Sequence, residues 1–182
     1  ADIVRNKALT WTSSLNFGHN KNKIINLGGQ EQIIGSYYIR KVGHAYHQYY
    51  VKEFAGINPE SGYPQYYIND PDNPGDRSIT EDQNKANYIM YKSPDPKLSG
   101  GWSNSLRYKW FDLNFMFTYT LGGYSYDNGA SKVEHAGKSE KGTIQTLYRD
   151  RWKQPGDVTN VEMFMVGNPY SMASVVNSRR IH

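Results

Sequence analysis

The sequence predicts an all-β fold, a partial antiparallel transmembrane β-barrel with long extracellular loops. Two segments, 9–17 and 100–121, alternate apolar and polar residues with a period of two, as strands with one apolar face do. The rest is rich in Tyr, Asn, Gly, Ser and Pro, which is typical of long polar loops. No run approaches the roughly 18 consecutive apolar residues of a transmembrane helix, so helical membrane proteins are excluded.

The first alternating segment predicts a single strand. Its odd positions are apolar at Leu9, Trp11, Leu15 and Phe17. Its even positions are polar at Thr10, Thr12, Ser14 and Asn16. Successive side chains of a strand point to opposite faces, so one face is apolar and the other polar. Residues 18–23 then carry the strand into water.

The second alternating segment, 100–121, predicts an antiparallel hairpin. Before a turn near 109–111, even positions are apolar at Trp102, Leu106, Tyr108 and Trp110. Odd positions are polar at Ser103, Ser105, Arg107 and Lys109. After the turn the apolar residues occupy odd positions, at Phe111, Leu113, Phe115, Phe117, Tyr119 and Leu121. The switch of parity across a short turn predicts a hairpin.

Strand length favours a membrane barrel over a soluble sandwich. Each arm has about ten residues, which matches a tilted strand that crosses the hydrocarbon layer, whereas soluble strands average about five or six. Arg107 and Lys109 on the polar face would point into the lumen. We therefore expect a transmembrane hairpin at 100–121, with membrane-facing side chains at Trp11, Leu15, Phe17, Leu106, Phe115 and Phe117.

Two long stretches predict extracellular excursions at 24–99 and 122–172. A structureless connection of this length does not suit a compact domain, so we expect further strands in the first one, at Ser36–Arg40, Tyr49–Gly56 and Tyr63–Ile68. The second excursion holds a short predicted helix from Gly142 to Trp152. Short turns on one side and long loops on the other are typical of outer-membrane barrels.

Composition excludes several function classes. The net charge is +4, but Lys and Arg are interleaved with acids, so no basic footprint for nucleic acid is present. The chain has no Cys, which excludes a disulfide framework and thiolate metal sites. No nucleophile elbow or Gly-rich phosphate loop occurs, so we expect no enzymatic activity. The first residues lack the features of a signal peptide and the last lack a closing turn, which indicates an internal piece.

One acidic stretch has the spacing of a calcium loop. Counted from the first aspartate, the carboxylates stand at ligand positions of such a loop, at Asp70, Asp72, Asp76 and Glu81. However, Pro74 replaces one ligand, Arg77 stands at a usually apolar position, and no flanking helices are evident. Two interpretations stay open, a calcium site and a plain acidic turn. No other cofactor is expected.

The 16 tyrosines allow a second function. Tyr63, Tyr66, Tyr67, Tyr124 and Tyr126 lie in the excursions, where aromatic rings could stack on sugars or anchor a partner. Packing within extracellular strands is the alternative for each. On this basis a soluble or surface Tyr-rich β-domain that binds glycans is the alternative to a membrane barrel.

An ordered series of segments resembles the SusC/RagA family of TonB-dependent outer-membrane transporters. It comprises residues 5–7 leading into 11–22, Phe54–Gly62, Ser93–Lys97, Gly100–Asn104, Arg107–Leu113, Leu121–Gly123, Arg151–Asp157 and Ser178–Arg179. The series covers nearly the whole chain. One departure is Trp110, where the family often has Gly in the hairpin turn.

The resemblance implies that residues 1–182 are an internal or C-terminal portion of a barrel of roughly twenty-two strands. It implies an outer-membrane location in a Gram-negative bacterium and import of oligosaccharides or peptides, energised by TonB through regions outside this chain. The implied partners are a SusD-like surface lipoprotein, the lipid bilayer and the imported substrate. The plug and the final membrane strands would lie outside these residues.

Overall fold

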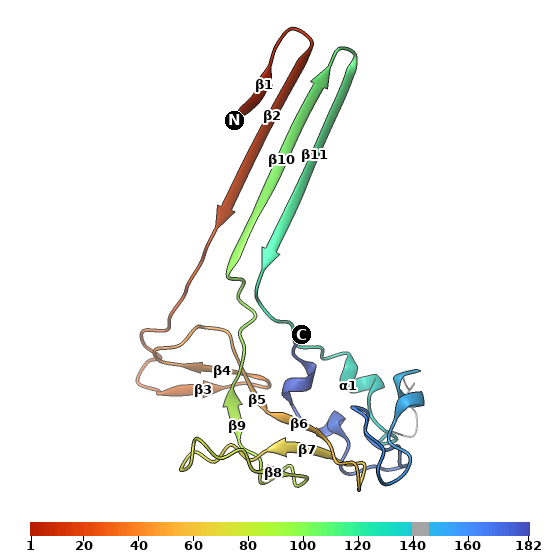
Figure 1. Ribbon diagram of the computed structural model, residues 1–182. Helices are drawn as coiled ribbons and strands as arrows, with labels where there is room; N and C mark the ends of the chain where they lie inside the picture. The colour runs from red at the N-terminus through yellow and green to blue at the C-terminus, as the bar shows by residue number, and fades with distance from the viewer. Residues whose placement is uncertain (140–145) are drawn as a thin grey trace.

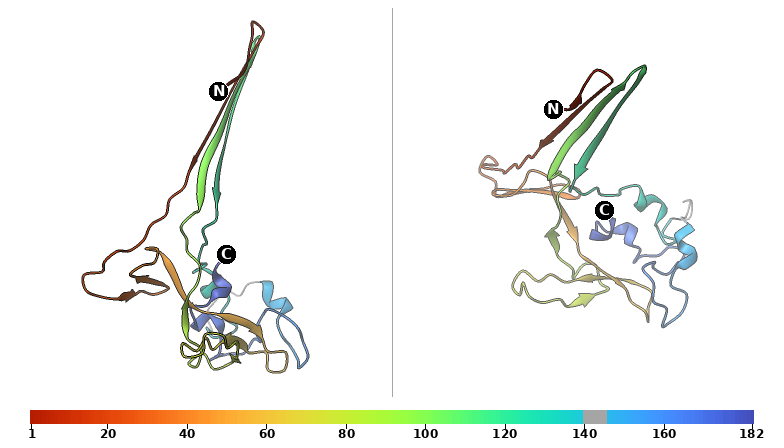
Figure 2. Two further views of the ribbon diagram at one scale, coloured as in Figure 1. Left: turned by 60° about the vertical axis from the view of Figure 1, so that its left-hand side comes forward. Right: turned by 45° about the horizontal axis from the view of Figure 1, so that its top comes forward.

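The computed structural model describes residues 1–139 and 146–182. In this part of the chain, a long narrow sheet stands at one end, and two smaller sheets, loops and short helices gather at the other (Figure 1). Both views of Figure 2 show the long sheet as a single layer that projects away from the remainder. The protein is therefore divided into the long sheet, formed by strands within residues 2–18 and 98–121, and a loop region. The loop region comprises residues 19–97, 122–139 and 146–182.

The long sheet has the strand order β1-β2-β10-β11. Its members are β1 (Asp2–Arg5), β2 (Leu9–Gly18), β10 (Leu98–Tyr108) and β11 (Phe111–Leu121). β10 pairs along its length with β11 and with β2, although about eighty residues separate β2 from β10. The predicted strand and the predicted hairpin are confirmed, and the hairpin begins two residues earlier than predicted. β1 was not predicted.

Both short turns of this sheet lie at the same end. Residues 6–8 join β1 to β2, and the two residues Lys109 and Trp110 join β10 to β11. The amide of Lys109 donates to the Ala8 carbonyl (3.1 Å), so the two turns touch. Lys109 has a φ of 50°, the left-handed value that the first position of a tight hairpin turn requires. Lys109 is therefore a turn residue, and its assignment to the polar face of a strand was wrong.

Residues 19–97 form the two smaller sheets. One contains β3 (Gln32–Ile34), β4 (Tyr38–Lys41), β5 (Gln48–Lys52) and β9 (Tyr88–Met90). The other contains β6 (Phe54–Ile57), β7 (Pro64–Tyr67) and β8 (Ile79–Thr80). The predicted strand Tyr49–Gly56 is in fact two strands in different sheets, because the chain breaks at Glu53 and the register of β6 shifts at Gly56. The other two predicted strands correspond to β4 and β7.

After β11 the chain is irregular, with short helices. They are α1 (Ala130–Val133) and the 3-10 helices η1 (Thr146–Asp150), η2 (Met172–Ser174) and η3 (Ser178–Arg180). The first residues of the helix predicted from Gly142 lie outside the described residues, and η1 forms within its remainder. Across residues 1–139 and 146–182, no helix has both the length and the apolar character that a membrane crossing needs.

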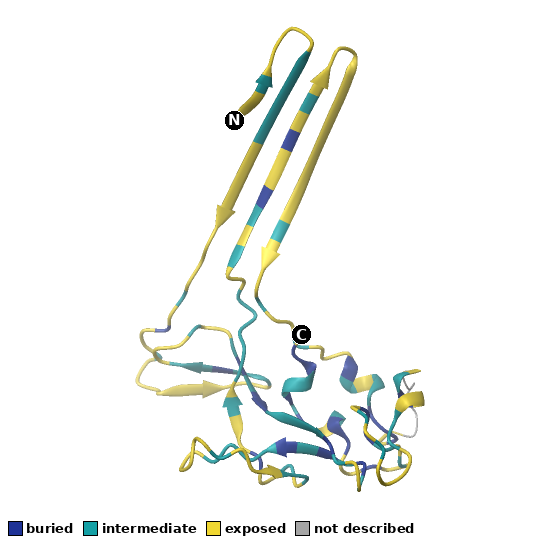
Figure 3. Cartoon of the chain, viewed as in Figure 1, coloured by how far each residue is buried: buried dark blue, intermediate teal, exposed yellow. Residues whose placement is uncertain are grey.

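Burial is confined almost entirely to the loop region (Figure 3). Tyr49, Val51 and Ile181 form one buried cluster, and Tyr66, Ala86 and Val175 form another. In the long sheet, only Gly101 and Asn104 are classed as buried. Among the described residues, neither face of that sheet is covered by a second layer (Figure 2).

Candidate functional site

One face of the long sheet is apolar across all three long strands. The register places Trp11 opposite Leu106, and Leu15 opposite Trp102, which in turn lies opposite Phe117. Since paired residues of antiparallel strands point to the same side, the six predicted membrane-facing residues share this face. We call it the apolar face; it comprises Leu9, Trp11, Leu15, Phe17, Trp102, Leu106, Tyr108, Phe111, Leu113, Phe115, Phe117, Tyr119 and Leu121.

Most side chains of the apolar face are exposed, and the rest are half-buried. Phe17 is 74% exposed, Leu15 64% and Phe117 59%. A soluble protein rarely leaves so many neighbouring large apolar groups in water. The surface is thus suited to an apolar environment.

Two polar residues interrupt the apolar face and accept hydrogen bonds from its tryptophans. Ser13 lies opposite Asn104 at the middle of the face. The indole of Trp102 donates to Ser13 Oγ (2.8 Å), and the indole of Trp11 donates to Asn104 Oδ1 (3.1 Å). Both indole N–H groups are therefore paired within the sheet, which suits a surface that water does not reach. The sequence signal for this pairing was the break in apolar parity at Ser13 and Asn104, which was not interpreted.

The opposite face is polar. Thr10, Thr12, Ser14 and Asn16 of β2 lie beside Ser103, Ser105 and Arg107 of β10 and Asp112, Asn114, Thr118 and Thr120 of β11. The guanidinium of Arg107 lies 3.2 Å from the carboxylate of Asp112. Met116 is the large apolar residue of β11 on this side and is 67% exposed. The predicted place of Arg107 on the polar face is confirmed.

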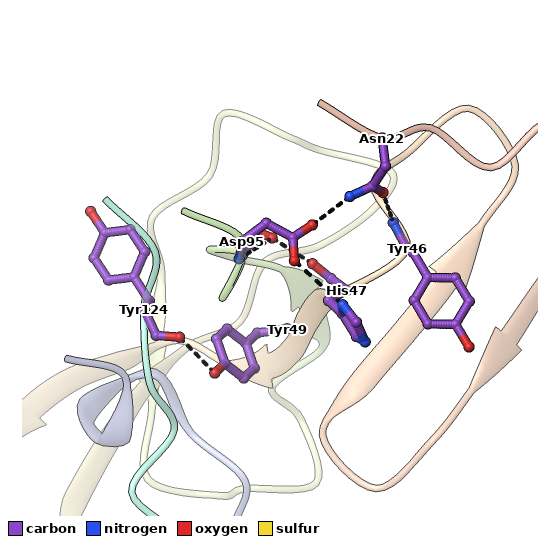
Figure 4. Close-up of polar contacts among 7 residues, drawn as sticks. Asn22, Tyr46, His47, Tyr49, Asp95 and Tyr124 are labelled. Atoms are coloured by element: carbon purple, nitrogen blue, oxygen red, sulfur yellow. Dashed lines mark hydrogen bonds and ion pairs between the residues drawn. The ribbon is translucent and has the colours of Figure 1, made fainter. Parts of the chain in front are cut away.

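A group of polar contacts, shown in Figure 4, joins chain segments that leave or enter the long sheet. The carboxylate of Asp95 accepts from Asn22 Nδ2 (2.7 Å) and lies 3.4 Å from His47 Nδ1. Asn22 Oδ1 in turn accepts from the amide of Tyr46 (2.7 Å). We call these residues the Asp95 clasp. It joins the segments that leave β2 and enter β10 to the start of β5.

Two neighbouring hydrogen bonds extend the Asp95 clasp. Ser93 Oγ donates to the carbonyl of His47 (2.6 Å), and Tyr49 Oη donates to the carbonyl of Tyr124 (2.8 Å) (Figure 4). The second bond brings in the chain that leaves β11. The segments that adjoin all three long strands are thus bound into one junction. Asp95 stands in a segment that carries the family resemblance, but its role was not predicted.

Three other segments of the resemblance meet in the loop region. Trp152 Nε1 donates to the carbonyl of Pro59 (2.6 Å), and the amide of Gly156 donates to the same carbonyl (2.9 Å). The amide of Phe54 donates to Ser178 Oγ (3.0 Å). These contacts join residues 54–62 to 151–157 and to 178–179, so the two excursions form one body.

The carboxylates of the calcium prediction make separate contacts with other groups of the protein. Asp70 accepts from the amide of Asp72 (3.0 Å), and Asp76 accepts from the amide and hydroxyl of Ser78 (2.9 and 2.7 Å). Glu81 accepts from Asn58 and Ser61. Within residues 1–139 and 146–182, no group of three His, Asp or Glu side chains could hold a metal ion. These contacts favour the acidic turn, and the calcium site stays a sequence-based prediction.

The five highlighted tyrosines differ in their surroundings. Tyr66 is 1% exposed and belongs to a core cluster, and the ring of Tyr126 stacks on Tyr37 with centroids 4.9 Å apart. The guanidinium of Arg77 lies 3.5 Å from the ring centroid of Tyr67. These three therefore pack within the protein. Tyr63 is half-buried like Tyr67 and Tyr126, and Tyr124 is exposed.

The loop region also contains a fully buried carboxyl group that sequence reasoning missed. Glu162 is 0% exposed and accepts from the amide of Met172 with both oxygens (3.1 and 3.0 Å) and from Ser171 Oγ (3.3 Å). Burial raises the pKa of Glu162 from its ordinary value of 4.5 to about 7, although these hydrogen bonds act in the opposite direction. The contacts fix the start of η2.

Comparison with known proteins places these features in context. No protein-family profile matches the chain. The TonB-dependent receptor P3 of Formosa agariphila is 29% identical over 137 residues, which cover 66% of this chain and 14% of the receptor.

Solved structures of similar fold cover the whole chain. A structure of the RagAB peptide transporter aligns with a TM-score of 0.83 at 22% identity, over 99% of this chain and 20% of that one. The RagAB peptide importer in its closed-closed state aligns with a TM-score of 0.83 at 21% identity, over 100% of this chain and 20% of that one. The chain thus spans about a fifth of these structures. The predicted resemblance to TonB-dependent transporters of the SusC/RagA type is confirmed.

Proposed function

We propose that this chain forms part of the wall and outer loops of an outer-membrane nutrient importer of a Gram-negative bacterium. The observation that carries the proposal is the apolar face, because its exposed aromatic and aliphatic groups run across three strands of ten or eleven residues. Such strands match the thickness of a bilayer, and their opposite, polar face suits a water-filled lumen.

The importer would take up peptides or oligosaccharides with energy from TonB, and a SusD-like surface lipoprotein would bind its outer side. The peptide alternative is supported by the solved relatives, which are described as a peptide transporter and importer. In this proposal the long sheet contacts lipid, and the loop region, which the Asp95 clasp joins to it, contributes to the outer vestibule.

A pair of substitutions on one strand tests the membrane assignment. Phe117 and Met116 are neighbours near the middle of β11, point to opposite faces, and are exposed to similar extents, 59% and 67%. An arginine that faces lipid near the bilayer centre costs about 2–4 kcal/mol, whereas a lumen-facing arginine costs little. We expect Phe117→Arg to abolish or strongly reduce insertion into lipid vesicles and Met116→Arg to leave it nearly unchanged.

Insertion can be measured by the protection of the protein from protease in vesicles. In a soluble glycan-binding domain both positions would face water, so the two variants would behave alike. Equal behaviour of Phe117→Arg and Met116→Arg would therefore overturn the membrane assignment.

A further inference from the structure

A cavity of about 570 Å³ lies in the loop region. Its lining comes from segments that are far apart in the sequence, and it includes Tyr63, Glu81, Asp82, Gln83, Asn84 and Tyr170. The first five belong to the first excursion and Tyr170 to the second. The cavity is thus a product of the fold that joins the two excursions.

An aromatic pair forms one part of the lining. The rings of Tyr63 and Tyr170 lie with their centroids 4.6 Å apart at an angle of 45°. The amide of Tyr170 donates to Oδ1 of Asn168 (2.9 Å), and Asn168 is itself 0% exposed. Tyr170 is 46% exposed, so its ring is held at its base and still faces solvent.

Two carboxylates form another part of the lining, and each is held by one oxygen. Oε1 of Glu81 accepts from Asn58 Nδ2 and from Ser61 Oγ, and Oδ1 of Asp82 accepts from the amide of Asn84 (2.9 Å). Among the described residues, no hydrogen bond reaches Oε2 of Glu81 or Oδ2 of Asp82. Both carboxylates are therefore fixed and retain an acceptor oxygen.

The charge of the lining is negative. It contains Glu81 and Asp82 and no Lys, Arg or His. The charge of the nearby Lys52 interacts with Asp82, but Lys52 is only 9% exposed and its ammonium group donates to the backbone carbonyl of Gln83. With Lys52 counted, the two carboxylates still leave one negative charge in excess. Carboxylate oxygens beside the half-buried ring of Tyr63 and the exposed ring of Tyr170 suit an organic cation, because ion pairs and cation–π contacts then act together.

We propose that this cavity binds the cationic side chain, ammonium or guanidinium, of a peptide substrate. The proposal rests on the proposed import function in its peptide form and names a subsite for it. It takes a peptide over a sugar because the lining supplies two fixed anions, for which a neutral sugar has no counter-charge.

Binding of short peptides to the protein in detergent tests the proposal. The probes are a tripeptide with arginine between two alanines and the same peptide with citrulline, which keeps the shape and removes the charge. We expect the arginine peptide to bind at least about tenfold more tightly by calorimetry. Glu81→Gln and Asp82→Asn should each remove most of this preference, because each keeps its oxygen acceptor and loses its charge.

Glu60→Gln is the matched control, since Glu60 is an exposed acid of the same excursion outside the cavity lining. It should leave the preference unchanged. Circular dichroism of each variant checks the fold, and Asp82→Asn remains informative if Glu81→Gln perturbs the contacts with Asn58 and Ser61.

Three results would overturn the cationic subsite. They are equal affinity for the two peptides, a preference that survives both cavity substitutions, or binding of maltotriose that is lost in Tyr170→Ala and indifferent to both charge substitutions. These results are independent of the vesicle insertion of Phe117→Arg and Met116→Arg, so a failure of the subsite and a failure of the membrane assignment are distinguishable.

Discussion

At the residue scale, Gly100 allows a tyrosine to cross the apolar face. Tyr119 lies opposite Gly100 and donates from its hydroxyl to the backbone carbonyl of Asn16 on β2 (2.9 Å). A Cβ atom on Gly100 would overlap both the Asn16 carbonyl oxygen and the Tyr119 hydroxyl. A Cβ atom on Gly101 would point to the other face, and its nearest neighbour would be the Phe117 carbonyl oxygen at 3.6 Å. The two adjacent glycines therefore have different requirements.

We expect Gly100→Ala to lower the free energy of unfolding by about 1–3 kcal/mol, because the Tyr119 ring or the strand must shift. Gly101→Ala has room for the methyl group and should change this free energy much less. Urea unfolding in lipid, followed by tryptophan fluorescence, gives both values. Equal losses in the two variants would contradict the steric argument.

Glu162 gives the loop region a dependence on pH. Its pKa is raised from 4.5 to about 7 by burial. The folded state therefore favours the protonated form, so this contribution to stability is complete below about pH 4.5 and is lost as the pH rises through 7. The charged and titratable groups around it include Tyr66, Tyr148, Arg179 and Arg180.

Glu162→Gln removes the titration and keeps a carbonyl oxygen that accepts from Met172. We expect the fall in unfolding free energy of the loop region between pH 4.5 and 8 to be smaller in Glu162→Gln than in the wild type, by up to about 3 kcal/mol. Thermal unfolding at a series of pH values measures this fall in free energy, and Glu60→Gln, at an exposed position, is the control. A pH profile of Glu162→Gln that matches the wild type would refute this role.

At the element scale, the long strands were predictable and the contacts between distant segments were not. β2, β10 and β11 each keep an apolar parity over about ten residues, with breaks at Ser13, Gly100 and Asn104, which is enough to distinguish a strand from chance. β1 has four residues and polar ends at Asp2 and Arg5, so it carries no such pattern. The predicted strand Tyr49–Gly56 merged β5 with β6, because the break at Glu53 leaves the local composition strand-like.

The Asp95 clasp shows why contacts between distant segments escaped prediction. Asp95 is 73 residues from Asn22 and 48 residues from His47, and neither partner has a distinctive neighbourhood in the sequence. The cavity of Glu81 and Tyr170 is hidden for the same reason. Tyr63 and Glu81 were singled out for other roles, as an aromatic contact and a calcium ligand, and the ordered series of family-like segments identified Pro59 and Trp152 without their contact.

At the scale of the whole molecule, the distribution of burial is the dominant feature. The loop region has buried clusters of its own, whereas the long sheet exposes its apolar face, and among residues 1–139 and 146–182 no strand pairs with the outer edge of β11 (Figure 3). An exposed apolar sheet with an open edge associates with other chains in water. The loop region and the long sheet should therefore respond differently to solvent.

We expect the chain to form large aggregates in plain buffer and to become a small, defined species in detergent, because micelles cover the apolar face. Sedimentation velocity in the two solvents measures the change.

Phe17→Ser combined with Phe117→Ser removes two of the most exposed aromatic groups of the apolar face and should shift the onset of aggregation to higher protein concentration. The matched control combines Val158→Ser and Val166→Ser, at exposed positions in the loop region. It should leave the onset of aggregation unchanged. A wild-type chain that is monomeric and cooperatively folded without detergent would contradict the lipid-facing assignment, since it would mean that water alone satisfies this sheet.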